Sequence, residues 1–155
     1  MFLTVHAVAG EVLAESLTNN PWWVFVVGFI SHFFVDALPH GDEDLGGPMT
    51  HPQVIRFLLA ITLFDISIMI ITQYILWRFG VVTNAVLFAA VFGAMLPDGL
   101  QVPDIVFPAG PRIFRWYRRA HERFHNALGI HLGIKKGLIF QALTLAILIA
   151  VLANI

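Results

Sequence analysis

The chain of 155 residues contains no cysteine. This absence excludes disulfide bonds, and it also excludes thiolate ligands from any metal site. A transition metal bound by this protein must therefore be held by imidazole nitrogens and carboxylate oxygens. The sequence supplies seven histidines and ten acidic residues from which such a site could be built.

Charge is scarce as well, because only 12% of the residues are charged whereas 58% are hydrophobic. A soluble domain of this size has too much surface for its volume to bury so many apolar side chains. We therefore predict an integral membrane protein. The apolar N-terminal stretch lacks a basic start and a small-residue cleavage motif, so we expect it to be the first helix rather than a signal peptide.

Hydrophobic runs separated by turn and proline signals predict an all-α fold, a polytopic bundle with about five membrane segments. The whole chain, 1–155, is predicted to form one membrane domain. The segments are expected at about 2–17, 21–38, 54–77, 82–96 and 137–155. The first is short and could be a half-membrane arm that pairs with the second. The polar stretch 98–136 has clustered arginines and aromatics after Pro111, which predicts a basic amphipathic helix at the headgroup level.

Basic residues are distributed unevenly over this predicted topology. Eight of the nine Lys and Arg residues fall on the side that holds the N-terminus and the stretch 98–136, and only Arg78 falls on the other side. Since basic residues are enriched in cytoplasmic loops, we expect a multi-pass protein of the inner (cytoplasmic) membrane. Its N-terminus would be cytoplasmic and its C-terminus outside.

The same topology gathers histidines and aspartates at the cytoplasmic side. His32 with Asp36, and His121 with His125, have the i,i+4 spacing that places two side chains on one helix face. Ionisable groups in a membrane segment cost about 2.5–3.5 kcal/mol each, and a divalent cation satisfies several at once. We predict a metal site, with zinc favoured over Mn or Fe and two ions roughly 3.5–4 Å apart. The predicted ligands are His6, His32, Asp36, His40, Asp98, His121 and His125.

Further polar residues near this side are candidates for other roles. Four acidic residues could act as the general base, transfer protons or orient ligands: Asp42, Asp104, Glu122 and Glu11. Four arginines could bind a substrate phosphate, although clustered arginines also serve as an orientation signal: Arg115, Arg118, Arg119 and Arg123.

Other polar residues are expected to lie outside the site. His51 and His131 are expected to be hydrogen-bonded packing residues, and Asp65 a buried group that bonds between helices. Glu43 and Asp44 are expected in a solvated acidic loop.

The segment from Gly28 to His40 resembles the G-x-x-S-H-x-x-x-D motif of bacterial membrane-bound metal-dependent hydrolases, which are distantly similar to zinc-dependent phospholipase C. An early histidine (His6), the G-x-x-L-P-D of Gly93–Asp98 and the H-x-x-x-H of His121 and His125 are similar too. In that family the last two motifs precede the first, whereas here they follow it. The resemblance therefore implies a permuted or sister family with a metal-dependent hydrolytic activity.

The function that these patterns favour is metal-assisted hydrolysis of a phosphoester in a lipid or lipid-linked substrate at the cytoplasmic headgroup level. The expected partner is membrane lipid, such as a phospholipid, and no nucleic acid is expected. Three alternatives remain: a divalent-cation or proton transport protein, a haem carrier that uses His6 and His32, and a subunit whose metal only fixes its helices. Small residues such as Ala89 and Gly93 could mediate contacts within the monomer or in a homo-oligomer.

Overall fold

A computed structural model describes residues 1–17, 19–41, 49–130 and 132–155. Over these residues the protein is entirely helical and has no strand. Seven α-helices and one 3-10 turn follow one another along the chain: α1 (Leu3–Glu15), α2 (Pro21–Asp36), α3 (His51–Arg78), η1 (Ala85–Leu87), α4 (Phe88–Gly99), α5 (Val102–Val106), α6 (Arg112–His125) and α7 (Ile134–Leu152). The all-α prediction is confirmed.

Within the described part of the chain, three helical stretches are long and apolar enough to cross a membrane: α3, the continuous stretch Ala85–Val106, and α7. The apolar helix α2 is shorter, and α1 has only 13 residues, or about 20 Å at 1.5 Å per residue. The prediction of five membrane segments is therefore not confirmed.

The predicted boundary at Pro97 is wrong. Helix α4 continues through Pro97 to Gly99, and the candidate span then extends through α5 to Val106. A proline inside a helix removes one backbone N–H donor, which bends or weakens a helix without always ending it. The predicted basic amphipathic helix is present as α6, and it continues through the second histidine pair.

Helices α2 and α4 pack against each other at two glycines. A Cβ atom added to Gly28 would lie 2.2 Å from the carbonyl oxygen of Ala90, and one added to Gly93 would lie 2.2 Å from that of Phe25. Only glycine allows the two backbones to approach so closely. The contact of Gly93 thus lies within one chain, and it brings the C-terminal ends of α2 and α4 together.

Helix α1 starts beside the middle of α3. The carboxylate of Asp65 accepts hydrogen bonds from the backbone N–H groups of Leu3 and Thr4 and from the hydroxyl of Thr4. A helix leaves its first N–H groups without partners inside the helix, and Asp65 satisfies two of them at the start of α1. Asp65 is therefore the buried interhelical group that was predicted.

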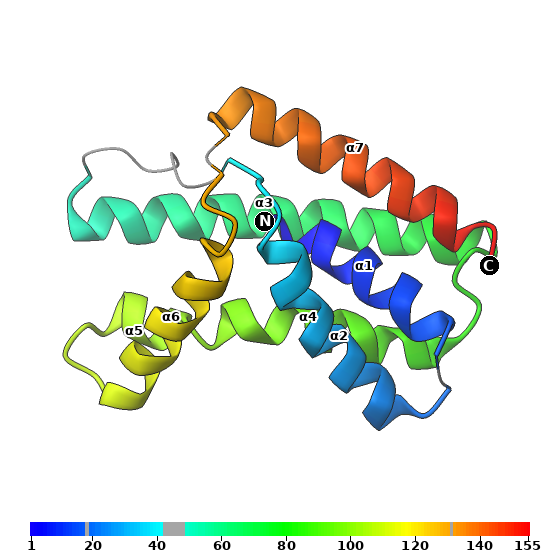
Figure 1. Cartoon of the computed structure of the whole chain (residues 1–155), viewed down its shortest axis with the longest axis horizontal. Coiled ribbons are helices and arrows are strands. Elements are labelled where there is room, and N and C mark those ends of the chain that lie inside the picture. The colour runs from blue at the N-terminus through cyan, green and yellow to red at the C-terminus, as the bar shows by residue number, and fades with distance from the viewer. Residues whose placement is uncertain (18, 42–48, 131) are drawn as a thin grey trace.

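Helices α1, α3 and α7 run in the same direction, toward the end of the molecule where the C-terminus lies (Figure 1). Eight residues beyond Asp65 on α3, Gln73 donates a hydrogen bond to Glu11 of α1. An apolar cluster fills the far end of the bundle. It consists of Val8, Ala14, Val24, Leu76, Val82, Leu87, Ala90 and Leu152.

Candidate metal centre

The ends of α1, α2, α4 and α6 bring all seven predicted ligands into one cluster. Five of them are almost entirely buried, with at most 4% of the residue surface exposed: His6, His32, Asp36, His40 and His121. The side chains of Asp98 and His125 are 32% and 19% exposed, and they mark the open side of the cluster. The cluster contains three groups in which one ligand atom from each residue lies within 4.8 Å of the others.

The first group consists of His32, Asp98 and His121. The Nε2 atoms of the two histidines are 2.9 Å apart, and each lies 3.6 Å from Oδ1 of Asp98. Ligands at about 2.0–2.1 Å from a tetrahedral zinc are about 3.3 Å from one another. The spacing of these three atoms is therefore close to that of ligands around one ion.

The second group consists of Asp36, His40 and His125. The Nε2 atoms of its histidines are also 2.9 Å apart. Oδ1 of Asp36 lies 3.7 Å from Nε2 of His40, and Oδ2 lies 4.0 Å from Nε2 of His125. This group repeats the chemistry of the first, with two imidazoles and one carboxylate.

Asp36 also connects the groups to one another. Its Oδ1 lies 3.5 Å from Nε2 of His6, which forms a third group with His32 and Asp36, and its Oδ2 lies 3.7 Å from Nε2 of His121. The amino group of Met1 donates to the same Oδ1 at 2.8 Å. Asp36 belongs to two of the three groups, so its carboxylate would help to hold a cation in either of them.

Backbone carbonyls fix the orientation of two imidazoles. Nδ1–H of His32 donates to the carbonyl of Ala94 at 2.8 Å, and Nδ1–H of His40 donates to the carbonyl of Leu38 at 2.5 Å. When Nδ1 is the donor, the lone pair is on Nε2, which is the nitrogen that faces the cluster. Such outer hydrogen bonds are typical of metal-binding histidines.

A cluster of hydrogen bonds alone does not satisfy these side chains. Among the residues that the structure describes, the two ring nitrogens of His6 and Oδ2 of Asp36 have no hydrogen-bond partner, although all three atoms are buried. Buried polar atoms are rarely left unpaired. The donor set of imidazoles and carboxylates, with these unpaired atoms at its centre, fits a divalent cation.

The rings of His6 and His32 lie nearly parallel, with their centroids 4.1 Å apart. Two axial histidines of one haem bind the iron from opposite faces of the porphyrin, so their rings cannot stack directly on each other. The haem hypothesis based on these two histidines does not fit the structure.

Burial lowers the pKa of His121 below its usual value of 6.5, and the nearby carboxylates of Asp36 and Asp98 raise it by less. His121 therefore binds its proton more weakly in the folded than in the unfolded chain. We expect the free energy of unfolding of the metal-free protein to decrease as the pH falls below about 6.5. Unfolding in detergent with a chelator, measured at several pH values, checks this. If the stability of His121→Gln depended on pH in the same way as that of the wild type, His121 would not be the group responsible.

The other predicted site residues lie beside the cluster or away from it. Asp104 accepts a hydrogen bond from Nε of Arg118 at 2.7 Å and lies 3.6 Å from Nε of Arg115. Arg118 also donates to Glu122 at 2.9 Å. Asp104 and Glu122 thus form ion pairs with arginines, and neither is among the residues of the three groups.

Arg119 and Arg123 are exposed on α6, where a phosphate could reach them. Glu11 is fully buried, with Gln73 as its partner, five residues beyond His6 along α1. Asp42, together with Glu43, Asp44 and His131, lies outside the described residues. His51 donates to the carbonyl of Ile105, so the predicted hydrogen bond is present, but its side chain is exposed and not a packing residue.

Two residues that the sequence analysis missed lie next to the cluster. Tyr117 precedes His121 by one turn of α6 and donates its hydroxyl to the carbonyl of Pro97 at 3.1 Å. Burial, together with the carboxylate of Asp98, raises its pKa to about 12. Gln141 of α7 is buried and bonds to the His40 backbone. The i,i+4 spacing of Tyr117 to His121 and the isolated amide in an apolar helix were the available signals.

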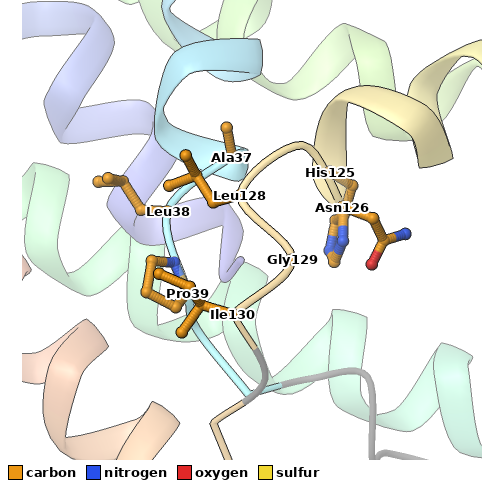
Figure 2. A pocket seen from close by; sticks show the side chains of 8 residues that line it. All are labelled: Ala37, Leu38, Pro39, His125, Asn126, Leu128, Gly129 and Ile130. Atoms are coloured by element: carbon orange, nitrogen blue, oxygen red, sulfur yellow. The ribbon is translucent and has the colours of Figure 1, made fainter.

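A small pocket opens beside His125 (Figure 2), between the segment after α2 and the loop after α6. Its walls are mostly apolar, and the His125 and Asn126 side chains stand together at one edge of it. It is a shallow surface depression without enclosed space for even a water molecule, so it gives no evidence of a ligand site.

Comparison of the chain with protein-family models, with curated proteins and with solved structures gives no match.

Proposed function

We propose that this protein is a membrane-embedded metal-dependent hydrolase with two ions, which acts on a phosphoester of a lipid or lipid-linked substrate. The observation that supports it best is the pairing of His32 with His121 and of His40 with His125 around the shared carboxylate of Asp36. Two-ion centres in hydrolases hold both the attacking and the leaving oxygen of a phosphoester. Bound ions would lower the pKa of a water toward neutrality and stabilise charge on phosphate oxygens.

The position of the cluster along the helices supports a substrate that comes from the membrane. Lys135 and Lys136 lie near the start of α7, six and five residues before Gln141, which contacts both Phe2 and the His40 backbone. At 1.5 Å per residue, Gln141 is about 7.5–9 Å along the helix from the lysines. If the lysines lie at the headgroups, the cluster lies just beneath them, near the ester bonds of a lipid.

Arginines of α6 could bind the phosphate of such a substrate, because guanidinium groups pair with phosphate oxygens. Arg119 and Arg123 are exposed, but each lies two positions from His121 and therefore on the face of α6 opposite to the two histidines. In this arrangement Arg115 and Arg118 are held by Asp104 and orient α6 over the cluster.

The test is hydrolysis by the purified protein in lipid nanodiscs, with bound metal measured on the same samples. We expect phosphate release or headgroup release from phospholipids or polyprenyl phosphates, and its loss when a chelator removes the metal. Zinc, manganese and iron added back separately would identify the ion. Undiminished hydrolysis by metal-free protein would contradict the proposal.

The same experiment separates the alternatives. Stoichiometric metal without hydrolysis of any lipid phosphoester would favour a metal that only fixes the helices. Transport predicts ion flux into liposomes, and it needs polar groups along the whole path. The described residues at the far end of the bundle instead form the apolar cluster around Val24, Leu76 and Leu152, which favours hydrolysis over transport.

A further inference from the structure

Helix α7 contributes none of the seven ligands, yet it contacts two segments that do. The side chain of Gln141, 4% exposed, accepts a hydrogen bond from the backbone N–H of Phe2 at 2.8 Å. Through its Nε2 it donates to the carbonyl of His40 at 2.9 Å. One amide thus links the start of α1, four residues before His6, to the backbone of His40.

The approach of α7 to His40 also depends on a glycine. A Cβ atom added to Gly137 would lie 2.2 Å from the carbonyl oxygen of His40 and 2.7 Å from Cα of Gly41. Gly137 is one helical turn before Gln141, so both contacts lie on the same face of α7. Together they place α7 directly against the backbone of His40.

His40 lies beyond the C-terminal end of α2, so helical hydrogen bonds do not fix its position. Its ring is oriented by the bond from Nδ1 to the carbonyl of Leu38, and its Nε2 lies 2.9 Å from that of His125. A histidine on such a segment keeps its place only when the backbone itself is held. Gln141 and Gly137 supply that restraint.

We propose that Gln141 is the positioning residue of the second group: through the backbone of His40 it sets the affinity of the ion held by Asp36, His40 and His125. This inference rests on the metal centre proposed above. Substitution of residues that orient metal ligands typically lowers affinity about 10- to 100-fold. The first group, whose histidine His32 is oriented by Ala94, should keep its ion.

The experiment compares metal binding by the full chain in detergent, using titration with Zn²⁺ and the absorption spectrum of bound Co²⁺. Gln141→Leu keeps the volume of the side chain but removes both hydrogen bonds. We expect it to weaken one ion about 10- to 100-fold, so that its binding curve and Co²⁺ spectrum approach those of His40→Ala. Gly137→Ala should act in the same direction, since its Cβ displaces the His40 backbone.

Matched controls are present in the same chain. Gln73→Leu also removes a buried glutamine that bonds to α1, but its partner is Glu11, away from the second group. Gly133→Ala adds a methyl group just before the start of α7, where none of the described residues has an atom within 4 Å. Both controls should bind metal as the wild type does, even if Gln73→Leu is less stable.

The outcomes separate the two proposals. If Gln141→Leu binds both ions like the wild type while His40→Ala loses one, the role of Gln141 is overturned and the metal centre stands. If His40→Ala binds metal like the wild type, or the wild type binds none, the second ion itself is refuted. An equal loss in Gln73→Leu would show a general effect of stability and would also overturn the inference.

Discussion

Asp36→Ala should remove both ions and lower hydrolysis to the background rate, a fall of at least about 10³-fold. Both oxygens of Asp36 are used: Oδ1 faces His6 and His40, and Oδ2 faces His121 and His125. Without this carboxylate, the pair His40–His125 loses the carboxylate of its group, and the pair His32–His121 keeps that of Asp98 but loses the negative charge of Oδ2 beside His121. Elemental analysis of the purified variant, followed by a phosphate-release assay, measures both effects.

Asp98→Ala is the control for this prediction. Asp98 belongs only to the first group, and its side chain is 32% exposed. We expect this variant to lose one ion and to retain the other. If Asp36→Ala and Asp98→Ala had the same stoichiometry, Asp36 would not bridge two ions.

Gly28→Ala should lower the free energy of unfolding by about 1–3 kcal/mol and abolish metal binding, although Gly28 touches no ligand atom. Its new Cβ would lie 2.2 Å from the carbonyl oxygen and 2.8 Å from Cα of Ala90, and backbone atoms cannot rotate away. Helices α2 and α4 must then separate, and the bond from His32 to Ala94 is lost with them. Thermal unfolding in detergent and metal analysis measure the two effects.

Gly93→Ala should have the same effect, because it forces the same pair of helices apart at Phe25. The loss of stability in the double variant should be smaller than the sum of the losses in the two single variants, because either methyl group already separates the helices. Gly133→Ala, with open space around it, should leave stability and metal content unchanged. Fully additive losses would mean that the two glycines act at independent contacts.

The sequence was a better guide to the side chains of the cluster than to the membrane segments. The pairs His32–Asp36 and His121–His125 lie on real helices, and spacing alone places each pair on one face. The L-P-H and L-P-D strings lie at the ends of α2 and α4, which meet at the cluster. These segments come together because the helix ends that carry them lie on the same side of the bundle.

The depth of each apolar helix in the membrane was harder to predict. Hydropathy marks an apolar run as a membrane segment, but it does not show whether the run starts at the interface or beside the middle of another helix. Helix α1 starts beside Asp65, the midpoint of α3, because a side-chain carboxylate caps it there. Nothing in the first seventeen residues indicates that partner.

Long-range hydrogen bonds were also invisible to sequence patterns. Gln141 bonds to residues 139 and 101 positions earlier in the chain, and no local periodicity predicts such partners. The sequence places Asp104 near the site as a candidate base or orienting group, whereas in the fold its carboxylate accepts a hydrogen bond from Arg118 of the next helix. A carboxylate, an imidazole and an arginine near one another can be paired in several ways, and the packing of α5 against α6 decides between them.

The cap that Asp65 provides to α1 has a consequence for biosynthesis. The ribosome synthesises α1 about 60 residues before Asp65, whose carboxylate accepts hydrogen bonds from the first N–H groups of this helix. Gln141, which bonds to Phe2, follows later still. During synthesis, α1 is therefore too short to insert stably and has polar groups that lipid cannot satisfy. It would wait at the membrane surface until α3 is inserted and then enter beside it. The metal centre can form only after α6, which supplies His121 and His125, has been translated, so ion capture would be a late step in maturation.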